Sequence, residues 1–337
     1  MNILVIGGTR NLGHYLVHSL VQAGHTVSVL NRGKTRDELP EAVERLRADR
    51  TVPAQLEAAL GARTWDVVVD NALYNGREAE TIAHLLEGRV GHYIFASTGQ
   101  VYLVREGAQR PFTEDDYDGR LMPPPKPSTY SYEEWSYGVE KRQAEDALTA
   151  AWEASGFPLT ILRLPMVNGE RDHFNRLNNY ILRLKDGGPI LLPSTPNFPL
   201  RHVYSGDVVE AILTLIDTGL GKGRAYNVSK DETLSLDEFL SLLGAIVGAQ
   251  PNIVRIKRDL LEANGFLPDC SPFSDRWMSE LDNRRGKAEL GLDYTPVRAY
   301  LERIVAHFNA HQPPHPVSYR RRHAERLLAL QHVQEQQ

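Results

Sequence analysis

A tyrosine and a lysine four residues apart are the side chains best suited to chemistry in this chain of 337 residues. Tyr137 and Lys141 fall in a segment, about 133–151, that we predict to be helical, so both lie on one helical face. A neighbouring ammonium lowers the pKa of a phenol and favours phenolate. Thr98, at the end of a predicted strand, is suited to share a substrate proton with Tyr137. Together the three residues indicate proton transfer coupled to hydride movement, although a Tyr–Lys pair at this spacing also occurs on ordinary helix surfaces.

A glycine-rich turn near the N-terminus is the expected nucleotide site. The apolar run at 3–6 predicts a strand buried on both faces, and apolar residues at helical spacing follow the turn. A strand, a tight turn and a helix together hold a dinucleotide pyrophosphate at the helix N-terminus. Arg10 replaces the central glycine of the G-x-G-x-x-G fingerprint, and we expect its guanidinium to reach a phosphate. The residues predicted to hold the pyrophosphate are Gly7, Thr9, Arg10, Asn11, Leu12 and Gly13. The alternative is a Gly-rich turn without a ligand.

The end of the second predicted strand bears on which dinucleotide binds. An acidic residue there would bind the ribose 2′-hydroxyl of NAD, whereas this chain has Asn31 and Arg32. Arg32, together with Lys34 or Arg36, is suited to the 2′-phosphate of NADP. NADP is therefore the expected cofactor, NAD is the alternative, and a solvated basic turn is the interpretation without a ligand. Lys141 is also expected to hold the nicotinamide ribose, and Tyr137 is expected to contact the cofactor as well.

Strands that alternate with helices predict an α/β fold, a doubly wound parallel sheet of the Rossmann type with a smaller C-terminal substrate lobe. Ligands bind beyond the carboxyl ends of such strands, so the residues that follow the strands should line one crevice. Those expected beside the cofactor are Asn31, Arg32, Asp49, Arg50, Asn71 and Ala72. The predicted strands are 3–6, 27–30, 43–46, 65–69, 92–96, 160–164 and 225–228. The predicted helices are 52–60, one that begins at 81, 133–151 and 208–215.

The same pattern predicts the domain limits. Residues 1–168 form the expected nucleotide-binding domain, to which 203–230 return, and 169–202 with 231–312 form the substrate-binding lobe. Residues 313–337 are a C-terminal tail, predicted as a surface helix. Within the second lobe we predict a loop-rich stretch at 187–199, a strand at 253–256, and a helix that begins with the capping box of Ser235 and Glu238. Residues 103–131 are an irregular insertion that we expect to act as a lid over the crevice.

Composition narrows the functional class. The chain has 38 Lys and Arg against 43 Asp and Glu, and its net charge of −5 disfavours a general nucleic-acid binder. The single Cys270 excludes an intramolecular disulfide and a Cys-based metal cluster. His14 and His18 share a helical face but lack an acidic partner at ligand spacing, so no metal site is predicted. Met1 leads directly into a predicted strand, and no apolar run has the length of a membrane helix. We therefore expect no signal peptide, no membrane partner and a cytoplasmic location.

Taken together, these motifs resemble the extended short-chain dehydrogenase/reductase family, the NAD(P)-dependent epimerase/dehydratase group, over about residues 1–310. The motifs are the glycine turn at 7–13, F-A-S-T-G-Q-V-Y at 95–102, Y-G-V-E-K at 137–141, R-L-P at 163–165 and V-Y-S-G-D-V at 203–208. The resemblance implies that Thr98, Tyr137 and Lys141 are catalytic and that Pro165 closes over the nicotinamide. It also implies a sugar or nucleotide-sugar substrate and a homodimer.

Two departures from the family pattern leave the activity open. G-G-T-R, together with N-R-G at 31–33, resembles an atypical subgroup that includes the chloroplast stem-loop RNA-binding proteins. L-R-H at 200–202 stands where nucleotide-sugar enzymes have an Arg-Asp pair that helps hold the diphosphate, so Arg201 is displaced. The leading hypothesis is an NADP-preferring reductase, epimerase or dehydratase with Tyr137 as general acid/base. The alternative is a non-catalytic RNA-binding or regulatory protein that makes its contacts through basic residues such as those at 320–322.

Overall fold

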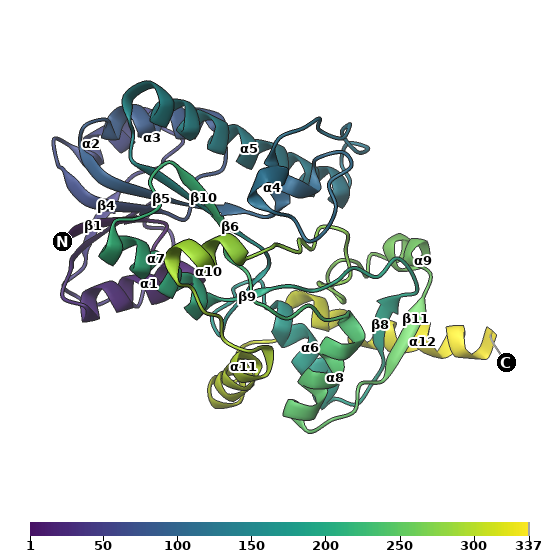
Figure 1. Ribbon diagram of the computed structural model, residues 1–337. Coiled ribbons are helices and arrows are strands. Elements are labelled where there is room, and N and C mark those ends of the chain that lie inside the picture. The colour runs from purple at the N-terminus through teal and green to yellow at the C-terminus, as the bar shows by residue number, and fades with distance from the viewer. Residues whose placement is uncertain (336–337) are drawn as a thin grey trace.

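The computed structural model describes residues 1–335, which form a larger α/β lobe and a smaller lobe (Figure 1). The strands of the larger lobe are β1 (Asn2–Ile6), β2 (Thr26–Asn31), β3 (Glu44–Arg47), β4 (Trp65–Asp70), β5 (Val90–Thr98), β6 (Leu159–Leu164) and β10 (Arg224–Asn227). They form one parallel sheet in the order β10-β6-β5-β4-β1-β2-β3. The predicted doubly wound sheet is therefore confirmed, and the strand order reverses beside β1, where such folds bind ligands.

Helices cover both faces of this sheet (Figure 1). The helices of the larger lobe are α1 (Asn11–Gln22), α2 (Pro53–Leu60), α3 (Gly76–Leu86), α4 (Gln100–Leu103), α5 (Tyr130–Ser155), α7 (Ser205–Thr218) and α10 (Arg284–Leu290), with the short η1 (Glu114–Tyr117). On β1, Ile3 and Val5 join the core beside α1 and α7. Leu4 and Ile6 join the core beside α3 and α5. Because successive strand side chains point to opposite faces, a strand covered on both sides needs an unbroken apolar run.

The smaller lobe packs a separate apolar core against the carboxyl side of the sheet. Its elements are α6 (Arg176–Lys185), β8 (Ile190–Pro193), α8 (Leu236–Val247), β11 (Ile253–Ile256), α9 (Arg258–Ala263), α11 (Val297–His311), η2 (Val317–Arg321) and α12 (Arg322–Glu335). The strands β8 and β11 pair in parallel. The chain passes between the lobes at two short strands, β7 (Val167–Asn168) and β9 (Val203–Tyr204), which also pair in parallel. Within residues 1–335, none of the helices combines the length and apolarity needed to cross a membrane.

Most predicted elements lie within a few residues of the observed ones, but one helix start is wrong and one helix was not predicted. Helix α3 begins five residues before the predicted start, because Asn75 caps it by accepting a hydrogen bond from the backbone N–H of Glu78 at 3.0 Å. Helix α6 was missed, since its polar Asn179 and Arg183 are as buried as its apolar residues and obscure the pattern. The stretch 187–199, predicted as loop-rich, also contains the short strand β8, Ile190–Pro193.

The insertion at 103–131 is not the free lid that the sequence predicted. Phe112 and Glu114 in its middle are buried. Asn227, at the end of β10, donates its backbone N–H to the Glu114 carboxylate at 2.8 Å and its side-chain amide to the Phe112 carbonyl at 2.9 Å. Because a buried carboxylate is stable only with such partners, the middle of the insertion is fixed to the sheet.

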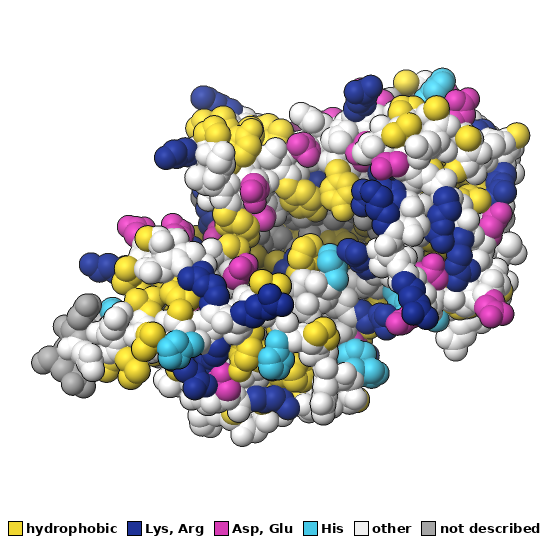
Figure 2. Space-filling view, turned by 180° about the vertical axis from the view of Figure 1, so that it is seen from behind, with side chains coloured by type: hydrophobic (Ala, Val, Ile, Leu, Met, Phe, Trp, Pro, Cys, Tyr) yellow, Lys and Arg dark blue, Asp and Glu magenta, His cyan; other side chains and the backbone are white. Residues whose placement is uncertain are grey.

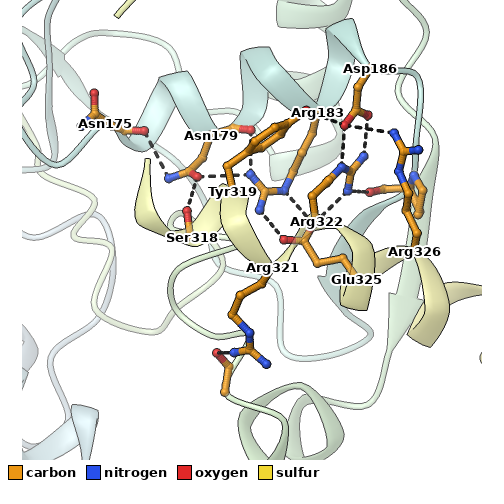
Figure 3. A network of polar contacts seen from close by, with 12 residues as sticks. Asn175, Asn179, Arg183, Asp186, Ser318, Tyr319, Arg321, Arg322, Glu325 and Arg326 are labelled. Atoms are coloured by element: carbon orange, nitrogen blue, oxygen red, sulfur yellow. Dashed lines mark hydrogen bonds and ion pairs between the residues drawn. The ribbon is translucent and has the colours of Figure 1, made fainter. Parts of the chain in front are cut away.

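The C-terminal tail docks on the smaller lobe rather than forming a simple surface helix (Figure 3). Arg183 of α6 and Glu325 of α12 are both fully buried and form an ion pair of 2.5 Å. Arg322 binds Asp186 through two hydrogen bonds of 2.7 Å. Arg321 donates to backbone carbonyls at 264 and 265. Two of the three arginines proposed to contact RNA are therefore engaged within the lobe, which removes most of the basis for that contact.

Because Arg183 and Glu325 form a buried ion pair, we expect the isosteric change Glu325→Gln to lower the stability of the protein strongly. Glu325→Gln leaves the Arg183 guanidinium buried without its counter-charge, so we expect the free energy of unfolding to fall by about 3–5 kcal/mol. Urea denaturation followed by circular dichroism measures it. The matched control is Glu302→Gln in the exposed Arg298–Glu302 pair, which should change stability by less than about 0.5 kcal/mol. Equal effects of the two changes would contradict the docking of α12.

Candidate active site

One cavity of about 1180 Å³ lies between the carboxyl ends of the sheet strands and the smaller lobe. Figure 2 shows a hollow between the two lobes, with Lys and Arg side chains gathered beside it on the larger lobe. The cavity is lined by every residue that the sequence singled out as a site residue: Gly7, Thr9, Arg10, Asn11, Leu12, Gly13, Asn31, Arg32, Asp49, Arg50, Asn71, Ala72, Thr98, Tyr137, Lys141 and Pro165. The fold brings these residues together, while their individual roles stay predictions.

The glycine turn forms a tight cradle at the start of α1. Gly7 has a φ of 83°, a conformation that favours glycine. A Cβ at Gly13 would lie 2.3 Å from the carbonyl oxygen of Gly7, so the helix start can approach β1 this closely only with glycine. No side chain caps the N-terminus of α1. Asn71 lines the same cavity, and both its side-chain nitrogen and oxygen are buried without a hydrogen-bond partner. Uncapped backbone N–H groups and an unpaired amide suit a dinucleotide with its phosphates.

The basic residues of the cavity gather at the end of β2. Arg10 was expected to reach a phosphate, but its guanidinium donates to the Thr35 hydroxyl at 3.0 Å, which turns it toward the loop of Arg32 and Lys34. The Asn31 side-chain oxygen accepts from the backbone N–H of Gly33 at 2.7 Å and therefore keeps that loop folded. Three cations thus lie where the ribose of an adenosine would meet β2.

Arg50 was predicted to lie beside the cofactor, but its guanidinium is bound to protein carboxylates. Its guanidinium makes two hydrogen bonds to the Asp70 carboxylate, at 2.8 and 3.0 Å, and an ion pair with Glu78 at 3.1 Å. Asp70 also accepts from the Tyr93 hydroxyl at 2.7 Å and from the backbone N–H of Ala72 at 3.0 Å. Arg50 is therefore already occupied by protein partners, and it orders the ends of β3 and β4 instead of offering a free cation. Sequence reasoning missed Asp70, although it immediately precedes the predicted Asn71.

The three candidate catalytic residues come from β5 and α5. Lys141 is 3% exposed and donates from Nζ to the Ala96 carbonyl at 3.1 Å. Burial lowers its pKa to about 8, although Asp70 and Glu145 act in the opposite direction. Burial raises the pKa of Tyr137 above its ordinary value, and its hydrogen bond with Thr98 offsets part of that rise. Desolvation of the phenolate is therefore the largest influence on this pKa, and the expectation that Lys141 makes Tyr137 more acidic stays a prediction.

A buried ion pair fixes the elements behind these residues. Glu145 of α5 and Arg163 of β6 lie 2.7 Å apart and are almost fully buried. Ser97 donates its hydroxyl to Glu145, which ties β5 to the same pair. Arg163 also donates to the Tyr102 hydroxyl at 2.7 Å. These contacts set the relative position of Thr98, Tyr137 and Pro165.

The smaller lobe adds a wall that sequence reasoning did not identify. Its cavity residues lie just before and in the missed helix α6, in the segment 268–279 and in the misjudged tail, where no local pattern marked them. They are His173, Phe174, Asn175, Arg176, Asn179, Pro268, Asp269, Pro272, Trp277, Met278, Ser279, Pro316, Val317 and Ser318. On the larger lobe, Tyr74, Gln100, Tyr130 and Glu134 line the same cavity. Ser318 of the docked tail donates to the side-chain oxygen of Asn179 (Figure 3). Across residues 1–335, no three His, Cys, Asp or Glu side chains cluster in a way that would hold a metal ion.

Comparisons with known proteins identify the family of this chain. The model of the NAD dependent epimerase/dehydratase family matches residues 3–229. A chloroplast stem-loop binding protein of 41 kDa from Arabidopsis thaliana is 26% identical over 250 residues, 70% of this chain and only 60% of that protein. The 2′-dehydrokanamycin reductase of Streptomyces kanamyceticus is 28% identical over 290 residues, 84% of this chain and 77% of that enzyme.

Solved structures agree on the fold. A dTDP-glucose 4,6-dehydratase from Bacillus anthracis, determined in complex with NAD, superposes with a TM-score of 0.74 at 16% identity, over 93% of this chain and 97% of that one. The family match covers well over half of the sequence. The protein therefore belongs to the NAD-dependent epimerase/dehydratase family, enzymes of the extended short-chain dehydrogenase/reductase type.

Proposed function

We propose that this protein is an NADP(H)-dependent reductase that interconverts a carbonyl and a hydroxyl group on a hydroxylated, sugar-like small molecule. The observation that carries the proposal is the set of Thr98, Tyr137 and Lys141 in one cavity with the glycine cradle of α1. The raised pKa of Tyr137 is compatible with a role as proton donor, because the phenol is protonated at neutral pH.

The residues of the chain have separate tasks in this mechanism. When bound, NADPH supplies the hydride that adds to the carbonyl carbon. Tyr137 donates its phenolic proton to the carbonyl oxygen as the C–O double bond becomes an alcohol. Thr98 donates a hydrogen bond to the same oxygen and orients it. Lys141, held by the Ala96 carbonyl, offers its remaining protons to ribose hydroxyls and keeps positive charge beside the phenolate that forms.

The basic end of β2 supports NADP over NAD. Arg32 and Lys34 are exposed and line the cavity, and Arg10 lies beside them through Thr35. The sequence has no carboxylate at the strand end to bind a free 2′-hydroxyl, whereas a 2′-phosphate would gain charge-assisted hydrogen bonds from these cations. An epimerase or dehydratase returns its hydride and needs no exchange of NADPH, so this site favours the reductase within the family.

Tyr137→Phe tests the acid/base assignment. A panel of keto sugars is first screened with the wild type for NADPH oxidation. With the substrate so found, we expect kcat to fall by about 10²–10⁴-fold, since proton donation is lost. The dissociation constant for NADPH should change little, because phenylalanine keeps the ring of Tyr137 beside the cofactor and removes only its hydroxyl. Tyr132→Phe, on the same helix but outside the cavity lining, is the matched control. Full activity in Tyr137→Phe would refute the assignment.

Charge removal at the β2 loop tests the cofactor preference. The double change Arg32→Ala and Lys34→Ala should weaken NADPH binding by about tenfold or more, because each cation contributes a charge-assisted contact to the 2′-phosphate. NADH binding should hardly change. Fluorescence titration measures both affinities, and Arg36→Ala, exposed in the same loop but outside the cavity lining, is the control. Equal weakening for NADH and NADPH would point to a general loss of the site.

The lowered pKa of Lys141 predicts an alkaline limit. Because the folded pKa is about 8, the ammonium is present below that pH and is lost progressively above it. We therefore expect kcat/KM for NADPH to decline as the pH rises through 8 in the wild type. Lys141→Met should lower kcat/KM at neutral pH and remove this decline. The control is Lys230→Met, because Lys230 also has a pKa of about 8 but lies outside the cavity lining. Persistence of the decline in Lys141→Met would exclude Lys141 as its source.

A further inference from the structure

We propose that the substrate of this site carries no nucleoside diphosphate, and is instead a hydroxylated carbonyl compound with an amine or another hydrogen-bond donor that Glu134 binds. The proposal rests on the reductase function above and specifies its substrate. It follows from how charge is divided between the two ends of the cavity.

Glu134 lies where a substrate held by Tyr137 would reach it. It stands three residues before Tyr137 on α5, so the two side chains share a helical face and both line the cavity. Its carboxylate accepts a hydrogen bond of 2.6 Å from Gln100, which follows Thr98 by two residues. The carboxylate thus adjoins the groups that act on the carbonyl oxygen, and its remaining acceptor capacity is available to a substrate donor.

The partners of Glu134 are hydrogen-bond donors and do not include a direct counter-charge. Burial raises its pKa, while the hydrogen bonds from Gln100 and Tyr130 act in the opposite direction. The other charged groups that act on it are Asp275, which raises the pKa further, and the more distant Arg176, which lowers it. Asp275 itself pairs with Arg258 at 3.4 Å. None of these contacts is a cation bound directly to the Glu134 carboxylate.

The smaller lobe offers little to a diphosphate. Among its described residues, Arg176 is the one Arg or Lys that lines the cavity, and it is already paired with Asp172 at 3.1 Å. Asp172 also accepts from the backbone N–H of Arg176 at 3.2 Å, so a carboxylate already occupies the start of α6. Burial lowers the pKa of His173, which leaves it neutral at pH 7. Asp269 adds a further acid to the wall.

Arg201 stands near the position where the family pattern has an arginine that helps hold a diphosphate, but its side chain does not reach the cavity. Arg201 does not line the cavity and donates to the Lys230 carbonyl at 2.9 Å. A diphosphate at this end would therefore face Glu134 and Asp269 without a free cation, and like charges at short range in a half-buried site repel. The rim is apolar instead, since Phe174 and Val317 line the cavity and are 60% and 73% exposed. The cations Arg10, Arg32 and Lys34 lie at the cofactor end.

The proposal can be tested without turnover by measuring how candidate substrates bind to an inactive variant that already holds NADPH. Full-length Tyr137→Phe is saturated with NADPH, whose titration verifies that the cofactor site is intact. Isothermal titration calorimetry then compares 1-amino-1-deoxy-D-fructose with D-fructose, a pair of ketones that differ by an amine in place of one hydroxyl. UDP-glucose and UDP are titrated as the phosphate-bearing probes. The same titrations are made with Glu134→Gln added, and with the exposed neighbour Glu133→Gln as the matched control.

We expect the amine-bearing ketone to bind about tenfold more tightly than fructose, which corresponds to one charge-assisted hydrogen bond. That preference should disappear with Glu134→Gln and remain with Glu133→Gln, while UDP-glucose and UDP give no saturable binding. Saturable binding of either UDP probe would overturn the proposal. So would equal affinity for the two ketones, absence of binding by both, or a preference that survives Glu134→Gln. Failure of NADPH to bind, or full activity of Tyr137→Phe, would instead overturn the proposed function.

Discussion

The attachment of α5 to β5 is the constraint on which the candidate site depends. Lys141 gives up its hydration to donate to the Ala96 carbonyl, and one turn further along the helix Glu145 binds Arg163 and Ser97. Removing one partner from such a buried pair leaves an uncompensated charge, so the contact tolerates little displacement. Because Tyr137 lies on the same helix, its distance to Thr98 is set by contacts that never touch a ligand. Thr98 and Tyr137 are therefore held in their relative positions before any ligand binds, as proton transfer requires.

The charged side chains differ between the two ends of the cavity, so each end is suited to a different kind of ligand group. Cations gather at the end of β2, whereas two other basic side chains of the cavity are bound to carboxylates, Arg50 to Asp70 and Arg176 to Asp172. Free cations attract phosphates, and paired cations mainly order the backbone around them. The family match over residues 3–229 includes the glycine cradle at the cofactor end and also α6 and β8 of the smaller lobe. Our proposal is that the described part of the smaller lobe lacks the free cations that a nucleotide sugar would need.

The C-terminal tail also contributes to the wall of the cavity on the side of the smaller lobe. Its docking through Arg183 and Glu325 brings residues 316–318 into the wall of the cavity, opposite the sheet (Figure 3). The same docking uses Arg321 and Arg322 for internal contacts, and so makes them poor candidates for contact with RNA. The predicted homodimer and cytoplasmic location stay predictions, since they concern partners and surroundings outside a single folded chain.

The sequence by itself determined the sheet and the cofactor end of the site. A buried parallel strand needs an unbroken apolar run, a tight βα turn needs glycine, and strand ends gather at one edge, so residues such as Gly13, Asn71 and Thr98 were predictable from local pattern. Only the tertiary structure decided the state of individual side chains. Burial raised the pKa of Tyr137, Asp70 binds the Arg50 guanidinium, and the Thr35 hydroxyl accepts a hydrogen bond from Arg10. Helix α6 and the tail lay beyond sequence reasoning because their burial depends on ion pairs between residues more than 130 positions apart, which no local pattern records.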